Sequence, residues 1–582
     1  MVRHLGNGIL LSSAPIAVVV AYFWAFGDSV WHPTDYEHLL AFAWRIWNGE
    51  VPYRDFIYHK PPLTIYLHTF WLVFPDGWQI RSSRLCFYLQ MAMSGLLPVV
   101  WAYVGGKVQF GWRQTFLGAA FLLIALHTFP VMPWYTSDGI LFDVIGLVAF
   151  VESIRPGQAR TGLWSRALAS TALTLAVLCK QSFFAPCVLF AAYALGEFVQ
   201  GLRQGGERGS PAFRRRWSML ACSILPASGL LAALVGSLVA TGAWEDFLHQ
   251  LLGQSTGQSL FLHGFVSYAE SPYLPVAVAG FLVPLLRLLD RRRGTGVFWL
   301  IRLAVWCVFA AMSAIVFRFA AARFGPLGFV FFFLQAGLFL GWLVGEIIAT
   351  RKLSVDREML FLHLGLLSIA WSSGISLGYW TPILGMAGFA LLWTQALPNE
   401  ESLLGDVVPA AFFAGVCAFS FGSANYEFPY RDQPRAHATE DLGQVFPKLA
   451  GIRTHREQVD AYFELRALIE EHAIRKDRPF VVLQDYPGIH YLTGQKNPIA
   501  IDWAWPPDIA GHERRLWGEL ERSGAVAIVP KQANAGVGWS REEAGRIPCE
   551  EWRFAGFNAL SRAVLRSWRL IGQGPRFCVL SR

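Results

Sequence analysis

Long apolar runs alternate with short polar connections over the first 424 residues of the chain. Runs of about 17–25 apolar residues have the length of a helix that crosses the hydrocarbon core of a bilayer. We therefore predict a polytopic α-helical membrane protein. Its thirteen spanning helices are expected at 8–26, 84–104, 115–133, 138–154, 164–180, 182–200, 217–241, 272–289, 297–317, 326–348, 358–376, 379–397 and 405–424.

Lys and Arg are concentrated in every second connection between these runs. The connections expected inside hold Lys107 and Arg113, the triplets at 214–216 and 291–293, and further basic residues. The short connections at 134–137, 242–271 and 377–378 hold none. Because basic loops stay on the cytoplasmic side, thirteen crossings from an inner N-terminus place the tail outside. The first run follows "MVRH" without an obvious small-residue cleavage site, so we expect a retained membrane anchor.

The tail after residue 424 has a different pattern. Residues 425–455 are polar and Pro-rich and are expected to be a linker. From 456 to 582, the helical stretch "REQVDAYFELRALIEEHAI" is followed by the strand-like runs "PFVVLQ", "AVAIVP" and "RFCVLS". This alternation predicts one small α/β domain on the outer face.

Composition agrees with a membrane protein. Of the 582 residues, 54% are hydrophobic and only 15% are charged, against about a quarter charged in soluble domains. The net charge of +8 follows from the basic loops, so we expect no nucleic-acid partner. Six of the eight cysteines lie in or beside apolar runs, as small buried hydrophobic residues do. Cys549 and Cys578 lie in the tail and are candidates for a disulfide in an oxidising compartment.

The first outer loop, residues 28–83, holds the richest set of ionisable side chains outside the tail. Thr34 and Glu37 form the capping-box pattern T-x-x-E, which predicts a helix that begins near Asp35 and ends at Asn48–Gly49. A second short helix is expected from Leu63 to Phe74 after the Pro-Pro pair. The first helix is amphipathic but too short to span, so we expect it to lie in the membrane interface, where its dipole favours an ionised Asp35. Capping accounts for Glu37.

Three stretches in and after this loop, "NGEVPYRDF", "HKPPL" and "RSSRL", carry a family resemblance. They resemble the first outer loop of the GT-C class of membrane glycosyltransferases. The similarity is to the protein mannosyltransferases (glycosyltransferase family 39) and to the lipid A aminoarabinose transferases. It covers residues 28–90, and "YPGIHYLTGQKNP" in the tail is similar to segments of the extra-membrane domains of such enzymes.

The resemblance implies a GT-C fold over residues 1–424 and an enzyme of the bacterial cytoplasmic membrane that works on the outer face. Such an enzyme moves a hexose or pentose from a polyprenyl-phosphate sugar to a glycan, lipid or protein acceptor. Asp35 matches the family's catalytic base, and Lys60 matches a lysine that contacts the donor phosphate. Tyr36 separates Asp35 from Glu37, where many members have an Asp-Glu pair. The alternative role of Glu37 is contact with the acceptor or a metal. His59 stands where relatives have a carboxylate, so a divalent metal is left open.

The chemistry of the donor fits this set of residues. A lipid phosphate leaves as an anion and needs no proton, so the site needs one base and several cations. Attack opposite the phosphate inverts the anomeric centre. Asp138 resembles a second carboxylate that places the acceptor or a metal, and its alternative role is a helix cap. The candidate cations on the outer side are Lys60, Arg54, Lys180, Arg318 and Arg323. Arg54 is also expected to brace the loop with Asp55.

Two other functions compete with the transferase. A transporter or flippase of lipid-linked sugars predicts internal repeats and functional charges at the middle of the spans. An O-antigen ligase or polymerase predicts its catalytic loop late in the chain. The ionisable residues gather at the outer face and in the first loop, which favours the transferase.

Overall fold

The computed structural model describes most of the chain, and its residues form two compact units. The described residues are 2–29, 31, 34–108, 111–127, 133–156, 161–203, 210–252, 266–293, 295–322, 326–350, 355–375, 390, 393, 407–429, 432–504, 506–531 and 558–582. The first unit, called the membrane unit below, comprises Met1–Phe23, Cys86–Gly236 and Ser255–Ala424. The second, called the loop–tail unit, comprises Trp24–Leu85, Ser237–Gln254 and Asn425–Arg582.

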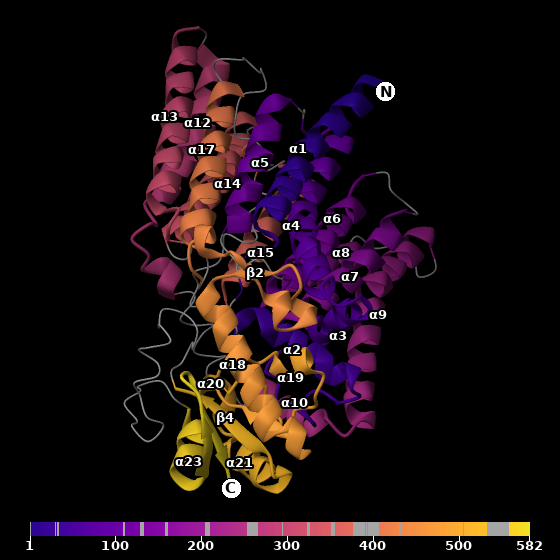
Figure 1. Ribbon diagram of the computed structural model, residues 1–582. Coiled ribbons are helices and arrows are strands. Elements are labelled where there is room, and N and C mark those ends of the chain that lie inside the picture. Colours follow the sequence, from indigo (N-terminus) through magenta and orange to yellow (C-terminus); the bar gives the residue numbers. More distant parts are fainter. Residues whose placement is uncertain are drawn as a thin grey trace. The chain divides into compact units, whose positions relative to one another are not determined.

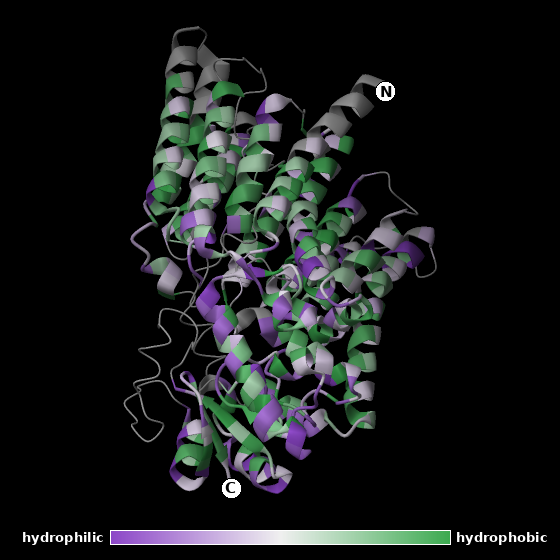
Figure 2. Ribbon diagram, viewed as in Figure 1, coloured by the Kyte–Doolittle hydropathy of each residue, from purple (hydrophilic) through white to green (hydrophobic). Residues whose placement is uncertain are grey.

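The membrane unit is built of long apolar helices (Figures 1 and 2). They are α1 (Val2–Phe26), α4 (Gln79–Val104), α5 (Trp112–His127), α6 (Tyr135–Ser153), α7 (Thr161–Cys179), α8 (Phe184–Arg203), α9 (Pro211–Ala240), α12 (Val276–Arg293), α13 (Thr295–Phe319), α14 (Pro326–Thr350), α15 (Arg357–Gly374) and α17 (Val408–Glu427). Six helices among the described residues are long and apolar enough to cross a membrane by length and composition. Twelve of the thirteen predicted spans coincide with these helices, and 379–397 falls almost wholly outside the described residues.

Small residues let two of these helices approach closely. Gly337 and Gly341 lie four residues apart on α14 and face α12, where Gly280 faces back. A Cβ atom at Gly337 would lie 1.9 Å from the carbonyl oxygen of Ala277, so no larger residue fits without moving α12. Small residues at this spacing are the common basis of helix pairing in membranes.

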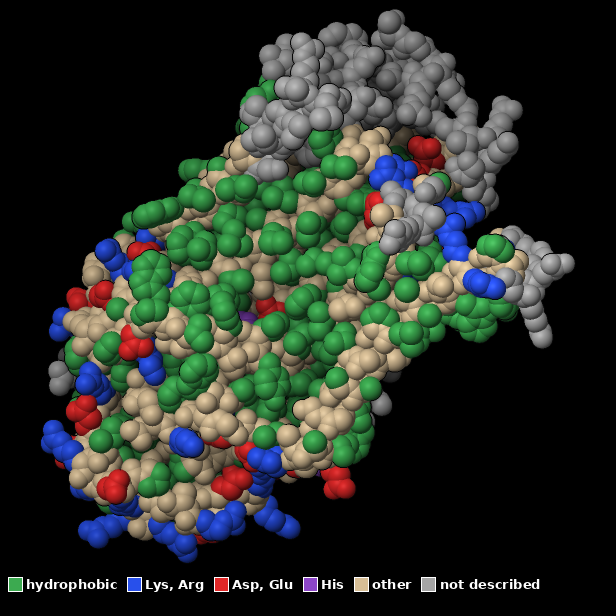
Figure 3. Space-filling model, turned by 90° about the vertical axis from the view of Figure 1, so that its right-hand side faces the viewer, with side chains coloured by type: hydrophobic (Ala, Val, Ile, Leu, Met, Phe, Trp, Pro, Cys, Tyr) green, Lys and Arg blue, Asp and Glu red, His purple; other side chains and the backbone are tan. Residues whose placement is uncertain are grey.

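Apolar side chains also cover broad areas of the surface (Figure 3). Trp164 on α7 is 76% exposed, and Leu225 on α9 and Phe419 on α17 are each 66% exposed. Water-soluble proteins rarely expose apolar surface on this scale, whereas lipid tails accept it. The polytopic helical membrane architecture predicted from the sequence is therefore confirmed.

The loop–tail unit contains the helices of the first loop, one later helix and the tail. The first loop forms α2 (Asp35–Trp47), α3 (Leu63–His68) and the 3-10 helix η1 (Thr69–Val73), and α10 (Trp244–Leu252) joins them. The tail forms 3-10 helices η5 (Arg435–His437), η6 (Leu442–Gln444), η7 (Pro447–Leu449) and η8 (Ile474–Lys476), and helices α18 (Arg456–His472), α19 (Ile489–Thr493), α20 (Pro506–Ile509), α21 (Glu513–Ser523) and α23 (Ala559–Ser567).

The tail strands form two sheets. The larger has the order β3-β4-β6-β5, from β3 (Phe480–Val482), β4 (Val526–Pro530), β6 (Phe577–Ser581) and β5 (Arg569–Gln573). Strands β3 and β4 are parallel, with Val481 opposite Ala527, and the other pairs are antiparallel. The predicted α/β character of the tail is thus present, and β5 is an additional strand without a clear apolar pattern.

The segment 425–455, expected as a linker, is folded, which corrects that interpretation. Strand β1 (Glu440–Asp441) pairs with β2 (Arg453–Thr454). Leu442, Val445 and Leu449 between them are fully buried. These apolar residues follow no regular period, so the sequence shows no strand or helix there.

The first loop is built into the hydrophobic core of the tail domain. Ile57 belongs to the same buried cluster as Val481, Ala527 and Leu580 of the sheet. The backbone N–H of Ile57 donates to the carbonyl oxygen of Ala500, at 2.8 Å. The loop and the tail are therefore parts of one folded unit.

Candidate active site

Asp35 is the first residue of α2, as predicted. The helix begins nine residues after α1 ends, and it stops at Asn48 and Gly49, where Gly49 has a φ of +83°. The first residue of a helix experiences the partial positive charge of the N-terminus, which stabilises a carboxylate. His38 lies one turn further along, and residues i and i+3 share a helix face.

Glu37 does not cap α2, which corrects the role predicted for it. Thr34 makes no side-chain cap hydrogen bond, and the Glu37 carboxylate is directed elsewhere. Tyr462 Oη of α18 donates to Glu37 Oε1, and the N–H of Gly488 donates to Glu37 Oε2 at 2.9 Å. Burial raises the pKa of Glu37 to about 8, which outweighs these hydrogen bonds, and the charge of Asp485 raises it further. Glu37 is therefore mostly protonated at neutral pH.

Lys60 lies in a group of ionisable residues from the loop and the tail. Burial, followed by the charges of Lys60 and His59, lowers the pKa of His38 to about 3. Burial and then Lys60 lower the pKa of His59 to about 4. Burial raises the pKa of Asp508 to about 6 although Lys60 opposes it. The charge of Lys60 thus acts on the pKa of all three side chains.

His38 thus relates Lys60 to the predicted base. It lies one helical turn after Asp35, and the nearby charge of Lys60 lowers its pKa. Asp35, the position predicted for the base, is therefore one helical turn from a residue on which Lys60 acts, and its own side chain lies outside the described part of the structure. The region defined by Asp35, His38, His59, Lys60 and Asp508 is called the loop site below.

The segment around Lys60 is held in an unusual backbone conformation. Tyr53 is fully buried with a φ of +71°, which non-glycine residues rarely adopt. Its hydroxyl group donates to the carbonyl oxygen of Lys60 at 2.6 Å. Gln250 of α10 donates to the carbonyl oxygen of Tyr53 and accepts from the N–H of Tyr58, at 2.8 and 2.9 Å. These bonds fix the turn that precedes the Pro-Pro pair.

His59 contacts the tail rather than a carboxylate cluster. Its Nε2 donates to the carbonyl oxygen of Asp508 at 3.1 Å and lies 3.8 Å from Asp508 Oδ1. The ring of His512 lies 6.1 Å from that of His59, and His249 lies 5.8 Å from His512. Among the described residues, no group of three or more His, Cys, Asp or Glu side chains is arranged to hold a metal ion.

Asp138 and Lys180 belong to the membrane unit. Asp138 is 3% exposed and accepts from Gln90 Nε2 at 2.7 Å. Ser137 Oγ accepts from the N–H of Trp134, so Ser137 occupies the capping role that was the alternative for Asp138. Lys180 is 3% exposed, between α7 and η2 (Gln181–Phe183), and its Nζ lies 3.5 Å from Thr136 Oγ1. The first turn of α6 therefore holds Asp138 and contacts Lys180.

The remaining candidates in the membrane unit have other settings. Arg318, in the last turn of α13, is exposed and lies 5.8 Å from the ring of Phe319. Arg323 lies outside the described residues. Asp143 of α6 is buried, and its carboxylate has no hydrogen-bond partner among the described residues.

Arg45 is a structural residue of the loop that the sequence analysis did not identify. Its guanidinium donates to Asp502 Oδ2 at 2.5 Å, to Glu50 Oε2 at 2.7 Å and to the carbonyl oxygen of Ile499 at 2.5 Å. Arg45 is 2% exposed. From the sequence, an arginine on an amphipathic helix is expected to be solvated. Its buried partner Asp502 lies 457 residues away, so no local pattern indicates the pair.

Arg54 has the bracing role expected for it. It donates twice to Asp55, at 2.8 Å each, and Asp55 accepts from the N–H of Val51 at 2.7 Å. The hydrogen bond from Arg54 lowers the pKa of Asp55, burial raises it by less, and the pKa stays below its ordinary value.

Of the predicted Cys549–Cys578 pair, only Cys578 lies among the described residues. Cys578 of β6 is disulfide-bonded. The six cysteines of the apolar runs are free. Cys179 and Cys417 are buried as expected, whereas Cys307 on α13 is exposed and the other three are half-buried.

No protein-family model and no curated protein matches the chain. Solved structures that resemble it include ArnT from Cupriavidus metallidurans in the apo state, at 13% identity and a TM-score of 0.45 over 99% of this chain and 98% of that one. The same ArnT bound to undecaprenyl phosphate is 11% identical, with a TM-score of 0.41 over 98% of this chain and 97% of that one. The Archaeoglobus fulgidus oligosaccharyltransferase complex with Zn and sulfate is 12% identical, with a TM-score of 0.33 over 90% of this chain and 68% of that one. At TM-scores below 0.5, the functional assignment depends on the residues of this chain.

Proposed function

We propose that the protein is an inverting glycosyltransferase of the GT-C class that uses a polyprenyl-phosphate sugar as donor. The acceptor is a hydroxyl group of a glycan, lipid or protein at the outer membrane face. The observation that carries the proposal is the loop site: Asp35 begins α2, the charge of Lys60 acts on His38 one turn later, and His59, next to Lys60, contacts Asp508 at 3.1 Å. The resemblance of the first loop assigns Asp35 to the catalytic base and Lys60 to the contact with the donor phosphate.

The proposed reaction needs only these two kinds of group. Asp35 accepts the proton of the acceptor hydroxyl as that oxygen attacks the anomeric carbon. The new C–O bond forms on the face opposite the donor phosphate, and the bond to the phosphate oxygen breaks. Its electron pair leaves with the polyprenyl phosphate, whose negative charge Lys60 stabilises. Preorganised cations of this kind are most effective where water is excluded.

The histidines of the loop site are suited to neutral roles. With pKa values of about 3 and 4, His38 and His59 are uncharged at neutral pH. Neither histidine therefore adds a positive charge beside Lys60, and Lys60 is the cation that contacts the donor phosphate. Asp508 faces Lys60 from the tail and limits the excess positive charge of the site.

Transfer by the purified protein tests this function. Full-length protein in lipid vesicles is incubated with undecaprenyl-phosphate sugars and with glycan, lipid and peptide acceptors. The expected product is a glycoside of inverted anomeric configuration, identified by mass spectrometry and NMR. Movement of the donor across the bilayer without any glycoside would instead support the transporter or flippase. Comparison of the lipid and glycan pools of a deletion strain identifies the sugar to use.

A further inference from the structure

A chain of buried hydrogen bonds connects both flanks of Asp35 to one side chain of the tail. Trp31 Nε1 donates to the hydroxyl oxygen of Tyr462 at 2.9 Å, and the same hydroxyl group donates to Glu37. Trp31 and Glu37 are each 1% exposed, and Tyr462 is fully buried. Trp31 precedes Asp35 by four residues and Glu37 follows it by two. One hydroxyl group on α18 therefore holds the chain on both sides of the proposed base.

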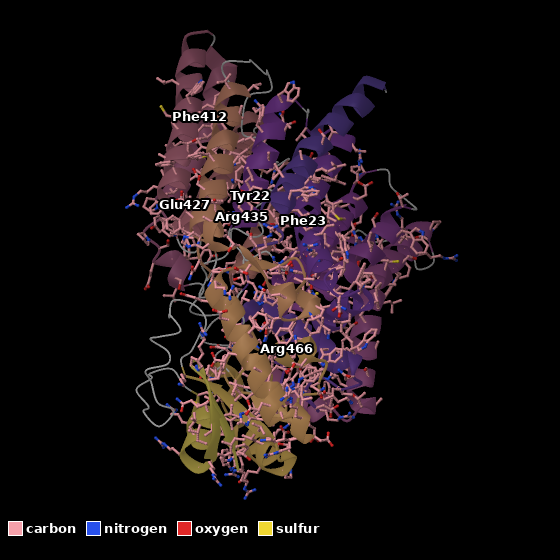
Figure 4. The ribbon with its side chains drawn as sticks, in the orientation of Figure 1. Tyr22, Phe23, Phe412, Glu427, Arg435 and Arg466 are labelled. Atoms are coloured by element: carbon pink, nitrogen blue, oxygen red, sulfur yellow. The ribbon has the colours of Figure 1, made fainter. Side chains whose placement is uncertain are left out.

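Further bonds hold the preceding flank. The backbone N–H of Trp31 donates to Asp432 Oδ2 at 2.9 Å. Arg435 is labelled in Figure 4. It donates to Ser29 Oγ and to Asp28 Oδ1, which precede Trp31, at 3.0 Å each. The segment that leads into α2 is consequently attached to the tail at successive points.

The following flank is held as closely. Glu37 Oε2 accepts from the N–H of Gly488. A Cβ atom at position 488 would lie 2.6 Å from Glu37 Cβ, so only glycine lets the backbone approach. Within the first turn of α2, the N–H of Glu37 also donates to the carbonyl oxygen of Thr34, at 3.3 Å. The backbone at Asp35 is thus fixed relative to Glu37.

We propose that Tyr462 is a positioning residue of the transfer reaction: its hydroxyl group sets the backbone at Asp35 through Trp31 and Glu37. This inference rests on the proposed function of Asp35 as base. Catalysis depends steeply on such placement, since a misplacement of about 1 Å costs on the order of 10²-fold in rate. The tail domain then acts as part of the catalytic machinery through the first loop.

The ring and the hydroxyl group of Tyr462 have separable roles. The ring packs against Phe446 and Tyr486, with centroids 5.9 and 5.2 Å away, and Tyr462→Phe keeps this packing. Only the link between Trp31 and Glu37 is removed. Tyr491→Phe is a matched control, because its buried hydroxyl group donates to Gln79 Oε1 at 2.5 Å and not to Trp31 or Glu37.

The kinetic test compares the two variants as full-length proteins. Tyr462→Phe should lower kcat by about 10- to 100-fold with an unchanged KM for the donor, as expected for a misplaced base. Tyr491→Phe should keep kcat within about threefold while showing a similar shift of the unfolding midpoint. Equal losses of kcat in both variants, or no loss in Tyr462→Phe, would overturn the proposal.

Hydrogen exchange separates this proposal from the proposed function. Amides in peptides that contain residues 34–40 should exchange faster in Tyr462→Phe than in the wild type, and remain unchanged in Tyr491→Phe. Unchanged exchange in Tyr462→Phe refutes the positioning role of Tyr462. An inactive wild-type protein refutes the transferase function, and the exchange result then still decides whether Tyr462 positions the backbone at Asp35. If Tyr462→Phe does not fold, Glu37→Leu takes its place, because a leucine keeps a similar volume and accepts neither of the two hydrogen bonds.

Discussion

Replacing Arg45 by Met should destabilise the loop–tail unit strongly. The guanidinium is 3% exposed and Asp502 is 2% exposed, so the variant leaves a buried carboxylate without its cation. It also leaves Glu50 and the carbonyl oxygen of Ile499 without their donor. Breaking a buried ion pair by removing one partner costs about 3–5 kcal/mol. For a unit of roughly 150–250 residues, this lowers the unfolding midpoint by roughly 6–20 °C.

Arg54→Met is the control for this prediction. Arg54 pairs with Asp55 at 2.8 Å in the same loop, but the two side chains are 45% and 30% exposed. Exposed pairs contribute about 0–1 kcal/mol, so its unfolding midpoint should fall by at most about 4 °C. The midpoints are measured by thermal unfolding of the full-length protein in detergent. Equal shifts in both variants would refute the inference that Arg45 attaches α2 to the tail, and Arg45→Met with Asp502→Asn should recover part of the loss.

Three further predictions concern pH, the donor and topology. The Glu37 pKa is raised from 4.5 to about 8, so the folded state binds a proton that the unfolded state loses. Stability is then full below pH 4.5 and falls by roughly 5 kcal/mol as pH rises to 8, and Glu37→Gln should flatten this dependence of the unfolding midpoint. Lys60→Met should weaken binding of undecaprenyl phosphate by about 10- to 150-fold, since a hydrogen bond to a charged group contributes about 1.5–3 kcal/mol. A cysteine in place of the exposed Ala436 should react with an impermeant reagent in intact cells.

Each of these has an outcome that contradicts it. A wild-type unfolding midpoint that varies with pH as it does in Glu37→Gln would reject the buried, protonated Glu37. Equal affinities of Lys60→Met and Arg54→Met for the lipid phosphate would remove Lys60 from the donor site. Labelling of Ala436→Cys only after lysis would place the tail on the inner side.

Local signals in the sequence were sufficient for the elements of the first loop. The T-x-x-E spacing, an amphipathic stripe and the Asn48-Gly49 pair predicted α2 within one residue, although the capping bond itself does not form, and the Pro-Pro pair predicted the start of α3. The residues around the proposed base could be selected because they lie together in the chain. Apolar length likewise predicted the spans, since crossing a bilayer leaves few alternatives.

The partners of these residues could not be predicted. Glu37 fits a capping box by spacing, but its hydrogen bonds go to Tyr462 and Gly488, which lie 425 and 451 residues away. No local pattern records such a pairing. The apolar residues of 425–455 follow neither a helical nor a strand period, and they are buried by tertiary contacts alone.

The most direct measurement of the central claim is the turnover of Asp35→Asn with an undecaprenyl-phosphate sugar and its acceptor. Asparagine keeps the shape of the side chain but cannot accept the proton, so the rate should fall by about 10²- to 10⁴-fold. Asp55→Asn changes a carboxylate of the same loop and should leave turnover within about threefold, because Asp55 is engaged in an exposed pair. Near-normal turnover of a folded Asp35→Asn protein would contradict the assignment of Asp35 as the base.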